Sequence, residues 1–139
     1  GVRCLMIPDS GLKAVQRRIL KHILSERPVS SCACAYRKGV GIRDNAAAHV
    51  GQESVLKLDI EDFFGSITSS AVYGLAFPGT LFPLPVRGLL TALCCCKGRL
   101  PQGSPASPAI SNLVMKPLTI RWISGAGREE SGTAGTATI

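Results

Sequence analysis

The chain has 139 residues, enough for one modest domain with a hydrophobic core but short for an enzyme that must grip a nucleic-acid duplex. Its 16 Lys and Arg against 9 Asp and Glu give a net charge of +7, which suits a surface that meets phosphates but occurs in many merely basic proteins. No long run of one charge occurs, which excludes a disordered polycationic tail. The first residue is Gly1 rather than Met, so we expect a piece of a longer protein.

The cysteines and the apolar stretches argue against two further classes of protein. The 6 cysteines form no CxxC pair, and no His stands at ligand spacing beside them, which argues against a zinc site. We expect reduced thiols that fill apolar gaps in a cytoplasmic protein. The apolar stretch 81–96 is too short for a membrane span and contains Pro83, Pro85 and Arg87, so no membrane association is predicted.

The N-terminal third of the chain predicts two helices. Apolar residues recur at helical spacing from Leu12 to Leu24, which indicates an amphipathic helix with a basic face that ends before Pro28. Residues 30–41 contain Ser, Cys and Gly and are expected to form a loop or short hairpin. A second, shorter helix is predicted over residues 42–50.

The next segment alternates between apolar and polar residues over positions 54–60, the pattern of a half-buried strand. Asp59 falls on its polar side. A carboxylate there is costly unless it faces solvent or a cation. Asp59 is therefore either a solvated residue at a strand end or part of a site.

Three more helices are predicted from capping residues and periodicity. Ser69 or Ser70 can cap the first of them, and the pair Ser107-Pro108 supplies an N-cap and a first-turn proline for the last. The three helices are expected over residues 69–77, 86–95 and 109–118. After Leu118 the sequence has no usable periodicity.

Residues 100–108 (LPQGSPASP) are a dense run of Gly, Pro and small side chains that leads into the last predicted helix. Such a run lets another backbone or a flat base approach closely. Taken alone, it is also the composition of any tight loop.

In combination, these segments resemble the reverse transcriptase family, in the form found in bacterial retrons and group II introns. Leu-Asp-Ile-x-Asp-Phe-Phe at residues 58–64 precedes Leu-Pro-Gln-Gly at residues 100–103, in the family's order and spacing. Residues 1–19 resemble the family's first fingers motif, and residues 36–49 resemble its second. Residues 39–41 are Gly-Val-Gly where these enzymes usually carry Gly-Arg-Ser, a departure that removes an expected nucleic-acid contact.

The resemblance implies an α+β fold, namely right-hand polymerase fingers and a partial palm with an antiparallel palm sheet and packed helices. Part of the fingers is expected over residues 1–50, and part of the palm, with motifs A and B, over residues 51–118. Residues 119–139 are expected to be a frame-shifted or disordered tail, because the chain is truncated before a recognisable Tyr-x-Asp-Asp motif.

The resemblance also assigns roles in motif A. Asp59 would be the catalytic carboxylate that binds two Mg²⁺ ions, and Ile60 beside it would contact metal and substrate. Phe64 would face the sugar and exclude a 2′-hydroxyl by its bulk. The alternative for Phe64 is an ordinary core aromatic.

Further roles fall on the loop and on basic residues. Gln102 and Gly103 would lie against the incoming nucleotide and template base, and Arg3 could reach the triphosphate. Three basic residues are expected to contact the template, although solvated surface positions explain them nearly as well. They are Lys13, Arg17 and Lys97.

The implied function is that of an RNA-directed DNA polymerase fragment. Two-metal phosphoryl transfer would join a dNTP to the 3′-hydroxyl of a DNA or RNA primer on an RNA template. The alternative is a catalytically inactive, basic nucleic-acid-binding remnant of a mobile element. Retron, group II intron and antiviral-defence parents share these motifs, and the oligomeric state stays open.

Overall fold

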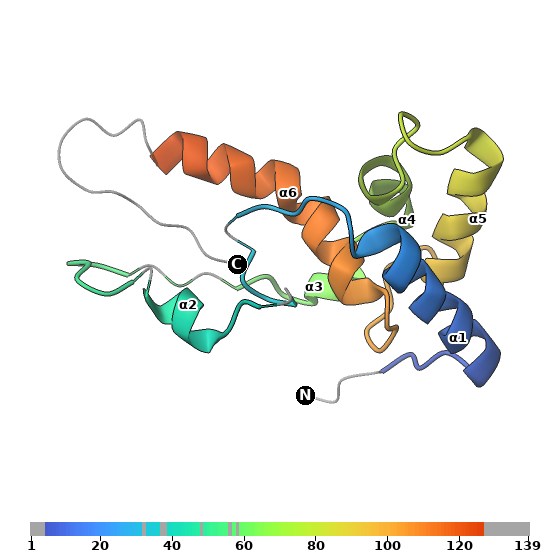
Figure 1. Ribbon diagram of the computed structural model, residues 1–139, viewed down its shortest axis with the longest axis horizontal. Coiled ribbons are helices and arrows are strands. Elements are labelled where there is room, and N and C mark those ends of the chain that lie inside the picture. The colour runs from blue at the N-terminus through green and yellow to red at the C-terminus, as the bar shows by residue number, and fades with distance from the viewer. Residues whose placement is uncertain are drawn as a thin grey trace. The chain divides into compact units, whose positions relative to one another are not determined.

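The structure is a computed structural model and describes residues 5–126, except 32, 37, 38, 48, 56 and 58. Two compact units divide the chain. Unit 1 comprises Gly1–Pro28 and Ile60–Val114, and unit 2 comprises Val29–Asp59 and Met115–Ile139. Helices are the regular elements of the described residues (Figure 1). Among these residues, no helix is long and apolar enough to cross a membrane.

The first helix of unit 1 confirms the predicted amphipathic helix. α1 (Ser10–Ile19) starts where the carboxylate of Asp9 accepts hydrogen bonds from the amides of Gly11 and Leu12, at 2.8 and 3.0 Å. This is an ordinary side-chain cap for amides that have no partner inside the helix. The helix then continues through one wider turn, η1 (Leu20–Leu24). Its buried side chains are Gln16, Ile19 and Leu24.

The helix predicted over residues 69–77 is confirmed as α4 (Ser69–Ala71), continued by a wide turn, η2 (Val72–Ala76). Its predicted cap is wrong by one residue. The hydroxyl of Thr68, which precedes both predicted serines, accepts a hydrogen bond from the Ala71 amide at 3.2 Å. Thr68 has extended backbone angles, as a cap residue should, whereas the serines already lie in the helix.

Three other helices belong wholly or partly to unit 1. α3 (Phe63–Ser66) was not predicted, while α5 (Leu84–Cys94) matches the helix predicted over residues 86–95. α6 (Ser107–Ala126) begins near the predicted start. However, Ser107, the predicted cap, is already the first residue of the helix, and its hydroxyl donates to the carbonyl of Pro101 at 2.7 Å.

Two arginines close the C-terminal end of η2 in unit 1. Arg87 donates to the carbonyls of Phe77 and Tyr73 at 2.7 and 3.1 Å, and its guanidinium carbon lies 3.9 Å from the centre of the Tyr73 ring. Arg27 donates to the carbonyl of Ala76 at 2.6 Å. The last carbonyls of a helix need such partners, and cations also suit the negative end of its dipole. The largest fully buried side chains among the described residues are Phe77, Leu100, Ile110 and Val72.

The strand predicted over residues 54–60 is not found among the described residues. Leu56 and Leu58 lie outside the described residues, and no other residue of that range is in a strand. Across the described chain the only β pairings are two isolated bridges, Thr68 with Arg99 and Cys96 with Arg99. A strand needs a neighbouring strand for its hydrogen-bond ladder, and alternation in the sequence cannot supply that neighbour. The predicted antiparallel palm sheet is therefore absent from the described residues.

Unit 2 contains α2 (Ile42–Ala47), which confirms most of the helix predicted over residues 42–50, and the end of α6. α6 runs on to Ala126 rather than ending near Leu118 as predicted. Thr119 is buried, and its hydroxyl donates to the carbonyl of Lys116 at 2.8 Å. The structure therefore describes residues 119–126 as part of a helix, residues 127–139 lie outside the described part of the chain, and the frame-shifted tail stays a prediction.

Candidate functional site

The Leu-Pro-Gln-Gly loop of unit 1 is held against the N-terminal segment. The amide of Met6 donates to the carbonyl of Gln102 at 2.9 Å. Gly103 has a φ of +118°, and a Cβ on it would lie 3.1 Å from the carbonyl oxygen of Met6. Both the backbone angle and the close approach require glycine at this position. The prediction that this loop admits another backbone is thus confirmed, and the backbone is the chain's own.

A buried polar pair holds the next residue of the loop. Gln16 on α1 is 2% exposed, and its side-chain amide donates to the carbonyl of Leu93 on α5 at 2.8 Å. The hydroxyl of Ser104 donates to the Oε1 atom of Gln16 at 2.9 Å. Sequence reasoning missed this contact, because Gln16 reads there only as one polar residue of a helix.

The segment that carries Phe64 is tied to the residues just before the loop. Arg99 donates to the carbonyl of Gly65 at 2.6 Å, and the Leu100 amide donates to the carbonyl of Ile67 at 2.9 Å. Phe64 itself is half-buried and meets Phe63 edge to face, with 5.3 Å between the ring centres. Unit 1 therefore brings the end of motif A and the Leu-Pro-Gln-Gly loop onto one framework, although they lie far apart in the sequence.

Asp59 and Ile60 are both exposed, Ile60 by 43%. They fall on either side of the boundary between the two units, Asp59 in unit 2 and Ile60 in unit 1. Among the described residues no three His, Cys, Asp or Glu side chains gather so that they could hold a metal ion. A carboxylate oxygen and a backbone carbonyl are donors of the kind that Mg²⁺ prefers, but one carboxylate does not make a two-metal site.

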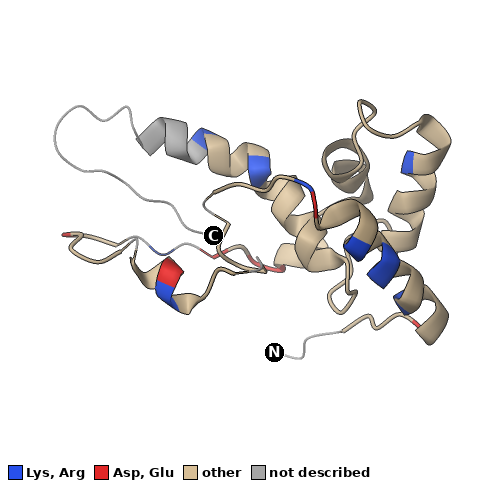
Figure 2. Cartoon of the chain, viewed as in Figure 1, with Lys and Arg blue, Asp and Glu red and all other residues tan. Residues whose placement is uncertain are grey.

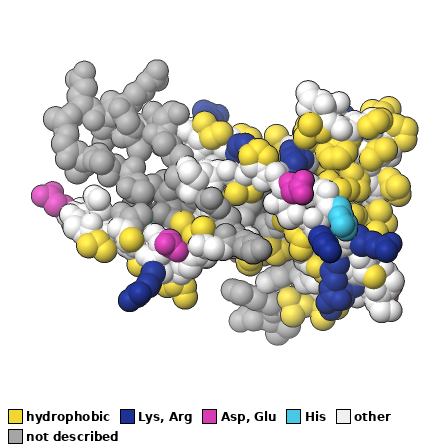
Figure 3. All heavy atoms as spheres, viewed as in Figure 1, with side chains coloured by type: hydrophobic (Ala, Val, Ile, Leu, Met, Phe, Trp, Pro, Cys, Tyr) yellow, Lys and Arg dark blue, Asp and Glu magenta, His cyan; other side chains and the backbone are white. Residues whose placement is uncertain are grey.

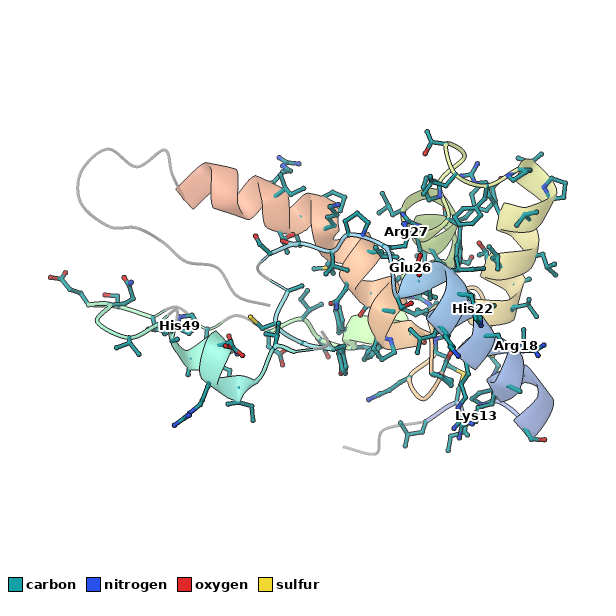
Figure 4. The ribbon with its side chains drawn as sticks, in the orientation of Figure 1. Lys13, Arg18, His22, Glu26, Arg27 and His49 are labelled. Atoms are coloured by element: carbon teal, nitrogen blue, oxygen red, sulfur yellow. The ribbon has the colours of Figure 1, made fainter. Side chains whose placement is uncertain are left out.

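The predicted template contacts lie on the surface of unit 1. Arg17 and Lys97 are exposed and Lys13 is half-buried, while Arg3 lies outside the described residues. The exposed residues Arg18, Lys21 and His22 extend the basic face of α1. Figure 2 shows several blue Lys and Arg positions along the ribbon of α1, and Figure 3 shows dark-blue side chains gathered beside a cyan histidine. Figure 4 places Lys13 and Arg18 on α1 and His22 on η1. The basic face predicted from the sequence is confirmed, and its contact with nucleic acid stays a prediction.

Comparison with known proteins agrees with these motifs. The family model for reverse transcriptase (RNA-dependent DNA polymerase) matches residues 1–131. The chain belongs to the reverse transcriptase family. It is 36% identical over 120 residues to the retron Ec86 reverse transcriptase of Escherichia coli. The matched region covers 86% of this chain and 37% of that protein. It is also 38% identical over 139 residues to the retron Mx65 reverse transcriptase of Myxococcus xanthus. That matched region covers 87% of this chain and 32% of that protein. This reverse transcriptase chain thus spans about a third of the length of these relatives.

This reverse transcriptase chain also contains an open groove that the sequence did not predict. It has a volume of about 450 Å³ and lies between α4–η2 and α5 in unit 1. None of the predicted site residues lines it. The residues that do so are Ser69, Ser70, Tyr73, Gly88, Thr91, Ala92, Cys95 and Gly98.

Three side chains at or next to this groove, those of Thr91, Cys94 and Cys95, are buried or half-buried. Burial raises the pKa of the Cys95 thiol to about 11, and burial with the neighbouring Cys95 raises that of Cys94 to about 12. Thiols with such pKa values are protonated at neutral pH, and the burial of Cys94 agrees with the expected role as apolar filling, whereas Cys96 is exposed and does not fill an apolar gap. Of the buried side-chain polar atoms in the described chain, the Thr91 hydroxyl oxygen is the one without a hydrogen-bond partner.

We expect Thr91→Val to leave the free energy of unfolding unchanged or to raise it by about 1 kcal/mol, because the substitution keeps the shape and removes an unsatisfied buried hydroxyl. Urea unfolding followed by circular dichroism measures it. Thr68→Val is the matched control. It removes the hydroxyl that caps α4 and should lower the free energy of unfolding by about 1 kcal/mol. An equal fall in the free energy of unfolding of both variants would show that the Thr91 hydroxyl has a hydrogen-bond partner.

Proposed function

We propose that this chain forms part of the fingers, over residues 1–50, and part of the palm, over residues 51–118, of an RNA-directed DNA polymerase. The complete enzyme would copy an RNA template by transferring the nucleotidyl group of a dNTP to the 3′-hydroxyl of a DNA or RNA primer, with release of pyrophosphate. The observation that carries the proposal is the anchored loop at residues 100–104, tied through Arg99 and Leu100 to the segment that follows motif A. Primer extension on an RNA template by the full-length protein tests it, and failure to incorporate dNTP would contradict it.

The proposed metal ligands are the carboxylate of Asp59 and the backbone carbonyl of Ile60, since the apolar side chain of Ile60 has no donor atom. Two Mg²⁺ ions, when bound, would neutralise charge on the attacking and leaving oxygens of the phosphoryl transfer. The protein's own part is to hold these oxygen ligands and to position nucleotide and primer. Further carboxylates are needed, and the family's Tyr-x-Asp-Asp motif would provide them.

The basic face of α1 and Lys97 would bind template phosphates. Lys13, Arg17 and Lys97 carry the positive charge that phosphate contacts need, and such contacts give affinity without sequence preference. The proposed palm would contain an antiparallel sheet once the rest of the enzyme is present. Because the compared relatives are retron enzymes, we propose a retron, with a cytoplasmic and antiviral role, ahead of a group II intron as the parent element.

A catalytically inactive nucleic-acid-binding remnant is the second candidate. The observation that favours it is that no cluster of metal-ligating side chains occurs in the described part of the chain. The two candidates share the basic face and differ in chemistry. Template binding without primer extension in the full-length protein would support the remnant.

We expect Phe64→Val in the full-length enzyme to raise the incorporation of ribonucleotides relative to deoxynucleotides. The ring of Phe64 is half-buried, so part of it is available to a substrate, and a smaller side chain would leave room for a 2′-hydroxyl. Competition between one dNTP and its rNTP in primer extension measures the ratio. Phe63→Val is the matched control, because Phe63 is also half-buried and packs against Phe64. Unchanged selectivity in Phe64→Val would show that Phe64 is an ordinary core aromatic and does not select the sugar.

A further inference from the structure

We infer that Gln16 is a positioning residue for the nucleotide-facing loop at residues 102–104, an inference that rests on the proposed polymerase function. Gln16 lies in α1, far from this loop in the sequence, and has no contact with the predicted metal ligands in the hydrogen bonds described above. Its role would be to set where the loop stands, and so where Gln102 and Gly103 meet the nucleotide.

The two ends of the Gln16 amide have fixed tasks. Its NH₂ group donates to the carbonyl of Leu93, and this bond turns its oxygen toward the hydroxyl of Ser104. The Ser104 oxygen in turn accepts a hydrogen bond from the amide of Ala106 at 3.3 Å. A continuous hydrogen-bonded chain therefore runs from α5 through the side chain of Gln16 into the loop. Ser104 is 5% exposed and Gln16 2%, so water cannot readily replace these bonds.

Apart from Met6 and Gln16, the loop is held by Ser107, whose hydroxyl donates to the carbonyl of Pro101 at 2.7 Å and whose amide donates to the carbonyl of Ser104 at 3.3 Å. Pro101 and Pro105 have no amide hydrogen, so the backbone on either side of the nucleotide-facing residues offers fewer donors. Gly103 is conformationally permissive, and it takes a positive φ here. The Met6 amide holds the carbonyl of Gln102 from one side, and Gln16 holds Ser104 from the other. Loss of the Gln16 anchor would leave the loop on the C-terminal side of Gly103 tied only to its own following residues, through the bonds of Ser104 to the amides of Ala106 and Ser107.

The test measures steady-state primer extension by the full-length enzyme with Gln16→Leu, Ser104→Ala and the double variant. We expect each single variant to lower kcat/KM for dNTP by roughly 10- to 100-fold, as small misplacements of positioning groups do. The dissociation constant for template and primer should stay at the parent value. Because both variants break one chain of bonds, the double variant should be no worse than the more severe single variant. Ser104→Ala removes the fewest atoms and serves if Gln16→Leu does not fold.

Ser111→Ala is the matched control. It also removes a buried hydroxyl, but one whose bond, to the carbonyl of Pro108 at 2.9 Å, stays inside α6. Its kcat/KM should remain near the parent value. If the parent extends primers and both single variants do so equally well, or if their effects simply multiply, the inference is overturned while the proposed function stands. A parent enzyme that binds template but cannot extend primers overturns both.

Discussion

Replacing Asp59 by Asn in the full-length enzyme should abolish magnesium-dependent primer extension. Asparagine keeps the size of the side chain but loses the negative charge that holds a divalent cation. Metal ions contribute several kcal/mol of transition-state stabilisation in such reactions, which corresponds to a fall in rate of about 1,000-fold or more. Single-turnover incorporation of one dNTP, titrated with Mg²⁺, measures both the rate and the metal requirement.

Template binding separates a metal ligand from a structural residue. Asp59 is exposed, and phosphate contacts are expected from the basic face of α1, so the Asn variant should bind template and primer as the parent does. Glu61→Gln is the matched control, since Glu61 is a second exposed carboxylate close by in the same motif. It should keep most of the activity. Parent-like polymerisation by Asp59→Asn would show that Asp59 binds no catalytic metal and is a solvated residue.

The helices were predictable because their signals are local. Apolar spacing over residues 12–24 gave α1, and periodicity and capping residues gave the regions of α4–η2 and α5. The prediction of a strand over residues 54–60 failed, because a strand depends on a partner strand that the alternation of a single segment does not specify. Family motifs supplied the roles of Asp59 and Phe64, which local pattern alone left open.

The anchoring of the loop was out of reach for a different reason. Gln16 is a buried polar residue on an amphipathic helix, and polar residues are buried only where they find partners. Its partners Leu93 and Ser104 are far away in the sequence, so the sequence gives no sign of them. The composition of residues 100–108 did predict a close approach of another backbone, but not that Met6 would supply it.

The segment over residues 131–139 leads to the second large effect that we expect, and we propose that it is a shifted reading frame. In this family Arg-Tyr-Ser-Arg-Tyr-x-Asp-Asp follows the Ser-Asn-Leu-Val helix, here residues 111–114, so the Asp pair is due near positions 138 and 139. The chain has Thr138 and Ile139 there. The residues in question are Ser-Gly-Thr-Ala-Gly-Thr-Ala-Thr-Ile. A shifted frame would combine the third base of each codon with the first two bases of the next codon. Read in this way, the codons for these nine residues can encode the whole motif.

Restoring this frame should turn an inactive chain into a competent one, because the motif would add the two carboxylates that a two-metal site needs beside Asp59. The same shift allows Asp in place of Thr119, a residue common at that point in the family. The competing interpretation is an ordinary Gly- and Thr-rich end, and third bases are free enough that some agreement could be accidental. The nucleotide sequence decides: third bases that give no Tyr and Asp codons in the alternative frame would end the proposal. If they do give them, the full-length enzyme of the primer-extension tests is the protein in the restored frame, and it should extend primers. The 139-residue chain in its present frame should bind template without extending it.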